Sequence, residues 1–257
     1  MIQQPTAISV LLRLGGISAI LAGGLFFLTV IYAFGFMSSL GFTQEMFDDR
    51  RLLLPWVADH TNVYSGLWLL YFASQMFMLP VPLALYTLTR HFGGWGSGVA
   101  APCAVVGTTA VAMAMVGLIV IYTTSPLVAH AYVGYADAAP SSLDKDSVLL
   151  LGDLFADVGK EIRLFSEVLL GIWLGGTGAM MVHQTRSSVV SWATLGIGGY
   201  TLCVAILKIL DPMNPLEDTL ALVLAMGYVG VGTQLLRRSG RLAARSSELR
   251  RTSTGLN

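Results

Sequence analysis

The sequence contains little charge for its length. Only 12% of its 257 residues are Asp, Glu, Lys or Arg, while 54% are hydrophobic. Soluble domains carry about 25% charged residues, so this chain has too few to cover a water-exposed surface. Charge is missing altogether from residues 14–40, 61–89 and 92–136. Runs of this length exclude a soluble protein with a large core and indicate membrane-spanning segments.

Three further absences exclude other classes of function. The 15 basic and 15 acidic residues give a net charge of zero, so no basic surface favours a nucleic-acid partner. The two cysteines, Cys103 and Cys203, lie in apolar runs and predict neither a disulfide nor a metal site, so no cofactor is expected. There is no GxSxG motif and no serine next to a histidine. These absences favour a protein that is not an enzyme.

Six segments are long and apolar enough to cross a bilayer core of about 30 Å as helices of about 20 residues. They are residues 14–37, 63–88, 99–124, 164–182, 189–209 and 216–236. The segments lack the alternation of barrel strands, and helices satisfy their own backbone hydrogen bonds in lipid. We therefore expect an all-α protein, with one polytopic six-helix transmembrane domain over residues 1–238 and a disordered basic tail over residues 239–257.

The distribution of arginine predicts the orientation, because cytoplasmic segments carry an excess of Arg and Lys. This distribution places both termini on the cytoplasmic side of a bacterial-type inner membrane. It places two long connections, residues 38–62 and 125–163, on the outer side. Both connections have amphipathic content, and we expect short helices in them. The arginines that decide the orientation are Arg237, Arg238, Arg241, Arg245, Arg250 and Arg251.

The densest group of charges lies at the start of the fourth span. On a helical wheel these charges share one face with Gly171, Gly175 and Gly178. Small residues mark the side on which membrane helices pack, so we expect the charged face to point into the bundle. The deepest carboxylate, that of Glu167, lies about one helical turn inside the hydrocarbon core of the membrane. The charges are Asp153, Asp157, Lys160, Glu161, Arg163 and Glu167.

The favoured hypothesis is a polar cavity, open to the outside, that binds or translocates a small solute or ion. Ionisable residues within a span are candidates for a functional site. Glu167 and Lys208 would form its floor, and Arg163 lies one turn from Glu167. The mouth would be formed by Glu161, Asp157, Asp153, Asp59 and His60.

Two alternatives remain open. Local pairs such as Asp157 with Lys160 and Arg163 with Glu167 would neutralise the stretch, as in an accessory or regulatory subunit whose charges only hold the bundle together. A membrane enzyme could instead hold a metal on the outer face through His60, His130 and nearby carboxylates. No HExxH motif supports that second alternative.

Three sequence stretches resemble bacterial six-span membrane families of unknown function. They are "RLGGISAILAGGLFFLTVIY", "LALYTLTR" and "EVLLGIWLGGTGAMMVHQTRSSVVSWATLGIGGY". The resemblance implies a six-helix inner-membrane bundle and assigns no site residues. The expected partners are the lipid bilayer, a small solute or ion, and a second copy of the chain or another membrane protein.

Overall fold

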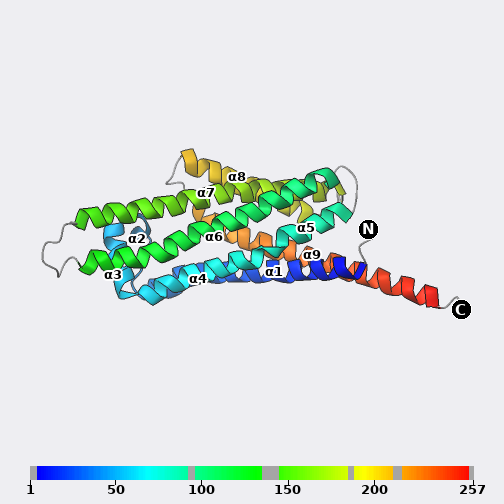
Figure 1. Cartoon of the computed structure of the whole chain (residues 1–257), viewed down its shortest axis with the longest axis horizontal. Coiled ribbons are helices and arrows are strands. Elements are labelled where there is room, and N and C mark those ends of the chain that lie inside the picture. Colours follow the sequence, from blue (N-terminus) through cyan, green and yellow to red (C-terminus); the bar gives the residue numbers. More distant parts are fainter. Residues whose placement is uncertain (1–4, 92–95, 135–144, 185–187, 211–215, 255–257) are drawn as a thin grey trace.

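The computed structural model describes residues 5–91, 96–134, 145–184, 188–210 and 216–254, and within these ranges every regular element is helical (Figure 1). Six segments are long and apolar enough to span a membrane, as the sequence predicts. They are Ala7–Met37, Thr61–Arg90, Gly98–Gly134, Lys145–His183, Val189–Leu210 and Thr219–Ala244.

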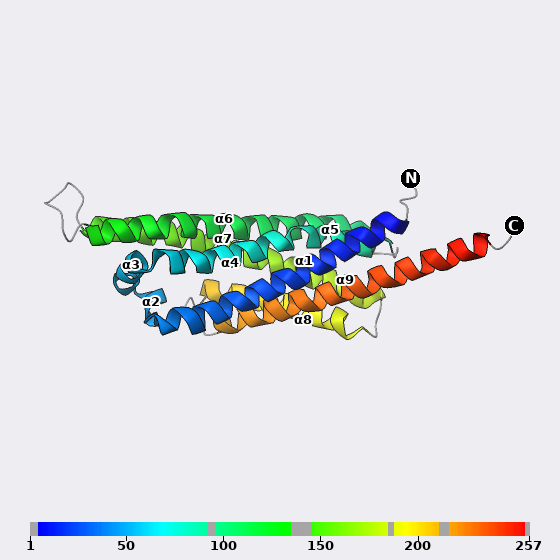
Figure 2. The ribbon, with the colours of Figure 1, turned by 90° about the horizontal axis from the view of Figure 1, so that it is seen from below.

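The spans are built from seven long helices that run side by side in an elongated bundle (Figures 1 and 2). The first span is α1, which continues into a short π-helix, η1 (Tyr32–Met37). The second span consists of α4 and α5, and the last four are α6 to α9. The bounds of these helices are α1 (Pro5–Ile31), α4 (Thr61–Met78), α5 (Pro80–His91), α6 (Gly96–Gly134), α7 (Lys145–Gln184), α8 (Val189–Leu210) and α9 (Leu216–Thr254).

The second span is interrupted just before Pro80. Helix α4 ends at Met78 and α5 begins at Pro80, with Leu79 between them. Proline supplies no backbone N–H, so Pro80 and Pro82 each remove one hydrogen bond from the helical ladder. The amide of Leu79 instead donates to the carbonyl of Met76 at 3.2 Å, which tightens the last turn.

Two short helices lie in the first long connection, which confirms that part of the prediction. They are α2 (Glu45–Asp48) and α3 (Arg50–Asp59). Both lie at one end of the bundle, which we call the α3 end (Figure 1). Leu54, Trp56 and Val57 of α3 are buried in a separate core cluster that includes Ala129 of α6 and Val148 of α7.

The second long connection differs from the expectation of a loop with short helices. Helices α6 and α7 have 39 and 40 residues, or about 60 Å each at 1.5 Å per residue, which is twice the thickness of a bilayer core. Residues 125–134 and 145–163 therefore extend the third and fourth spans. Only residues 135–144 of this connection lie outside the described part of the chain.

The basic tail was expected to be disordered, but α9 continues as a helix through Thr254. In Figures 1 and 2 this helix runs beyond the bundle on the side where α1 begins. The described ends of the chain thus lie on the same side of the bundle, as six spans require. Which side of the membrane they face stays a prediction.

Candidate functional site

The most deeply placed charge is Glu167, near the middle of α7 and only 8% exposed. A buried carboxylate requires a partner, because the charged form loses its hydration. Lys208 of α8 supplies one, with Nζ 2.9 Å from Oε2 of Glu167. Arg163, one turn earlier on α7, places Nη2 3.5 Å from Oε1. The two predicted contacts of Glu167 are thus present.

Close packing of α7 against α8 brings Lys208 to the level of Glu167. A Cβ added to Gly198 would overlap the backbone of Gly175, and one added to Gly178 would overlap the backbone of Leu195. A Cβ on Gly171 would lie 2.8 Å from the backbone nitrogen of Leu202. Only glycine permits this approach, and the antiparallel register that results places Lys208 beside Glu167.

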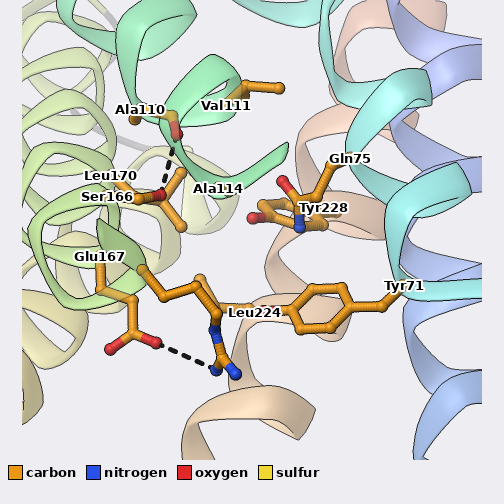
Figure 3. Close-up of a pocket in the computed structure, with 11 residues that line it drawn as sticks. Tyr71, Gln75, Ala110, Val111, Ala114, Ser166, Glu167, Leu170, Leu224 and Tyr228 are labelled. Atoms are coloured by element: carbon orange, nitrogen blue, oxygen red, sulfur yellow. Dashed lines mark hydrogen bonds and ion pairs between the residues drawn. The ribbon is translucent and has the colours of Figure 1, made fainter. Parts of the chain in front are cut away.

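A small cavity of ≈ 20 Å³ lies beside Glu167, with room for about one water molecule (Figure 3). Four helices line it. Tyr71 and Gln75 come from α4, and Tyr228 comes from α9. The remaining lining residues are Ala110, Val111 and Ala114 of α6, Arg163, Ser166, Glu167 and Leu170 of α7, and Leu224 of α9.

The polar side chains around the cavity are held in place by specific contacts. The guanidinium carbon of Arg163 lies 5.4 Å from the centroid of the Tyr71 ring, within the range of a cation–π interaction. Phe26 of α1 packs edge-on against Tyr71, with ring centroids 4.8 Å apart. Ser166 donates a hydrogen bond to the carbonyl of Ala110 at 2.8 Å, which links α7 to α6.

Three of the polar residues that line the cavity, Tyr71, Gln75 and Tyr228, were not predicted from the sequence. Figure 3 shows their side chains directed from α4 and α9 towards the space beside Glu167. One signal was present: Tyr71 and Gln75 are four residues apart and so share a helix face in an otherwise apolar run. No comparable pattern marks Tyr228.

The expectation that the whole charged face of the fourth span points inwards is wrong for its outer half. Asp157, Lys160 and Glu161 are exposed and do not line the cavity. The same face is packed at Gly171 and Gly178 because α8 covers it there. Helix α8 ends at Leu210, two residues beyond Lys208, so it does not extend along the outer half of α7.

Asp153 forms an ion pair with Arg50 at the α3 end. Its Oδ1 lies 2.8 Å from Nε of Arg50, and an Nη of the same arginine donates to the carbonyl of Gly152. These contacts tie α3 to the extended part of α7. A place for Asp153 at the mouth of a cavity stays a prediction, as it does for Asp157 and Glu161.

The structure places the remaining candidates, Asp59, His60 and His130, at the α3 end. Asp59 is exposed at the end of α3. His60 stacks on Trp56 with ring centroids 4.7 Å apart, and Nε2 of His130 lies 3.1 Å from the hydroxyl of Thr61. Among the described residues, no three His, Cys, Asp or Glu side chains gather to hold a metal ion.

A protein-family model described as "Domain of unknown function (DUF4386)" matches residues 21–238. This range covers nearly all of the six spans and every residue that lines the cavity. No curated protein and no solved structure matches the chain.

Proposed function

We propose that this chain, which belongs to the family described as "Domain of unknown function (DUF4386)", binds a small solute or ion as a step in translocation across the membrane. The binding site would be the cavity beside Glu167, which we call the Glu167 cavity. The family membership confirms the resemblance predicted from the sequence. The chain is a multi-pass membrane protein by its six apolar helices. The binding role is our inference.

The burial of Glu167 beside a cavity carries the proposal. Ionisable groups inside a membrane span are costly, and they commonly mark ion or substrate pathways. Here the carboxylate lies where α4, α6, α7 and α9 meet, with Lys208 approaching from α8. A displacement of any of these helices would change its surroundings, as a translocation site requires.

The polar lining favours a binding site over an ion pair that serves packing alone. A structural pair of Glu167 and Lys208 would be satisfied by its own contact. It would not need Tyr71, Gln75 and Tyr228 directed into the same space from two other helices. Small-molecule sites typically combine an apolar wall with a few convergent polar groups of this kind.

The size of the cavity limits its occupant. A volume of ≈ 20 Å³ accommodates one water molecule or a single-atom ion. A larger solute would enter only if the helices moved apart. The interruption at Leu79, four residues beyond Gln75, offers a place for such a movement because the backbone ladder is already broken there.

The proposed location is a bacterial-type inner membrane with both termini in the cytoplasm. The support is the basic end of the molecule, where Arg13, Arg90 and Arg237 are exposed. The cavity would then open towards the α3 end, on the outer side.

The proposal is tested by the charge displaced when salt is rapidly added to proteoliposomes that contain the full-length protein. The salts are NaCl, KCl and sodium gluconate, and empty liposomes set the baseline. Wild type is expected to give an ion-dependent current. Glu167→Gln is expected to reduce it to the baseline, because the amide removes the charge that organises the cavity.

Glu161→Gln is the matched control, since Glu161 is an exposed carboxylate six residues earlier on the same helix. Glu167→Gln leaves two cations without their carboxylate, so it is paired with the double variant Glu167→Gln, Lys208→Gln. Size-exclusion chromatography verifies that each variant is folded. Equal currents from wild type and from folded Glu167 variants would refute the proposal.

A further inference from the structure

We infer that Tyr71 and Arg163 form a gate on the side of the Glu167 cavity that faces the α3 end, where the ring of Tyr71 holds the guanidinium of Arg163 across the path to Glu167. This inference rests on the proposed function and identifies the residues that control access to its site. It follows from the levels of the lining residues along their helices and from the contacts between them.

The residues that line the cavity lie at different levels along the bundle. Helices α4 and α7 both begin at the α3 end (Figure 1). On α7, Arg163 precedes Glu167 by one turn, and on α4, Tyr71 precedes Gln75 by one turn. Tyr71 and Arg163 are thus the lining residues of these two helices that lie closest to the α3 end.

The other two helices contribute only short or apolar side chains at this level. Helix α6 runs in the opposite direction and places Ala114 there, and α9 places Leu224 there. The space between α4 and α7 is therefore spanned by Tyr71 and Arg163. The guanidinium carbon lies 5.4 Å from the ring centroid, and Figure 3 shows the ring extending from α4 towards α7.

Arg163 lies between Glu167 and the α3 end, and it is the more accessible of the two. Its side chain is 22% exposed, against 11% for Glu167. The stem of the arginine packs against α6, since a Cβ added to Gly117 would lie 3.0 Å from Cγ of Arg163. A solute that approaches Glu167 from the α3 end therefore meets the guanidinium first.

The arginine is the part of the gate that moves. Its Nη2 lies 3.5 Å from Oε1 of Glu167, which is longer than the about 2.7–2.9 Å of a charge-assisted hydrogen bond. The ring of Tyr71 is packed edge-on against Phe26, with centroids 4.8 Å apart. Arg163 can thus leave the ring while Tyr71 stays in place and Lys208 keeps its contact with Glu167 at 2.9 Å.

Access to the cavity is tested with a cysteine reporter at Ser166, which lines the cavity and is only 3% exposed. Cys103 and Cys203 are first replaced by alanine, and Ser166→Cys is then introduced into the full-length protein. The purified protein in detergent is treated with sulfonatoethyl methanethiosulfonate, a charged water-soluble reagent, and mass spectrometry gives the labelling rate. Glu161→Cys, at an exposed position on the same helix, gives the rate without a barrier.

Removal of either member of the gate should open the path. Tyr71→Leu and Arg163→Gln are each expected to raise the labelling rate of the Ser166 reporter at least about fivefold, because the contact between ring and guanidinium is lost. Tyr71→Phe keeps the ring, so its rate should equal that of the parent protein. This rescue assigns the effect to the ring rather than to the tyrosine hydroxyl.

Two controls distinguish the gate from a general loosening of the bundle. Tyr228→Leu removes a ring of the same size from α9, one turn deeper than Leu224, and should leave the labelling rate unchanged. A second reporter, Thr177→Cys, lies on α7 at a position that is 1% exposed and does not line the cavity. It should label no faster in Tyr71→Leu. Thermal unfolding verifies that each variant is folded.

The outcomes separate this inference from the proposed function, because labelling requires no bound ion. An unchanged rate in folded Tyr71→Leu or Arg163→Gln overturns the inference, and so does a parent rate equal to that of Glu161→Cys. Equal acceleration by Tyr228→Leu, or of the Thr177 reporter, also overturns it. The expected labelling pattern without an ion-dependent current from wild type would support the gate and refute the proposed function.

Discussion

The charges of Glu167 and Lys208 compensate each other in a buried ion pair, whatever else the pair does. The two side chains are 11% and 12% exposed, so both charges are largely removed from water. Removing one partner of such a pair costs about 3–5 kcal/mol, because the other charge is left uncompensated. A single substitution at either position therefore tests stability and function together, and a further design is needed to separate them.

Charge reversal across the two helices separates these roles. Glu167→Lys and Lys208→Glu should each lower the unfolding midpoint, and the double variant should recover part of the loss, with a coupling energy of about 0.5–3 kcal/mol. The recovered protein should give no ion-dependent current, because its carboxylate is on α8, at a position that does not line the cavity. A double variant that recovers the current as well as stability would show that the two charges only hold the bundle together and do not form the site.

At the scale of elements, the contact between α7 and α8 is set by a stripe of glycines. Gly198 lies against the backbone of Gly175, while the neighbouring Gly199 has no atom within 4 Å of an added Cβ. The two positions are adjacent in sequence and differ only in which side of α8 they occupy. They form a matched pair for testing whether close packing holds Lys208 beside Glu167.

Gly198→Ala should destabilise the purified protein by about 1–3 kcal/mol, because α7 and α8 must separate to admit the methyl group. Gly199→Ala should leave the protein unchanged or stabilise it by up to about 1 kcal/mol, since alanine favours the helix. Thermal unfolding of the two variants in detergent measures both effects. A loss of stability in Gly199→Ala equal to that in Gly198→Ala would contradict this packing.

The same elements show why some contacts were predictable. Helices α7 and α8 are joined by a short connection, so counting residues from that connection places Lys208 near the depth of Glu167. No short connection joins α4 or α9 to α7. Which of their faces meets Glu167 depends on the packing of the whole bundle, so Tyr71 and Tyr228 were not predicted.

The outer ends of α6 and α7 illustrate a different limit. The third span was expected to end at Thr124, but the helix continues through Pro126 to Gly134. Hydropathy locates the part of a helix that lies in lipid, and it gives no signal where the helix extends into water. The six spans were therefore predictable, while the projecting hairpin was not.

At the scale of the whole molecule, the orientation has a direct test. Cys103 and Cys203 are first replaced by alanine, and a single cysteine is then introduced as Asp146→Cys at the α3 end or Arg241→Cys at the opposite end. A membrane-impermeant maleimide should label the first variant in intact cells and the second only after permeabilisation, since arginine-rich ends stay in the cytoplasm.

Detergent-solubilised samples of both variants serve as the control for labelling. The reverse pattern, with Arg241→Cys labelled in intact cells, would place the α3 end in the cytoplasm. The cavity would then have to open inwards, and the direction of the proposed translocation would be reversed.

The charge displaced by a salt jump in proteoliposomes tests the central claim most directly, because it reports ion movement at the site without requiring that the ion be known. The account predicts that wild type and Glu161→Gln displace the same charge and that folded Glu167 variants displace none above empty liposomes. Wild-type displacement in the folded double variant Glu167→Gln, Lys208→Gln would contradict the account.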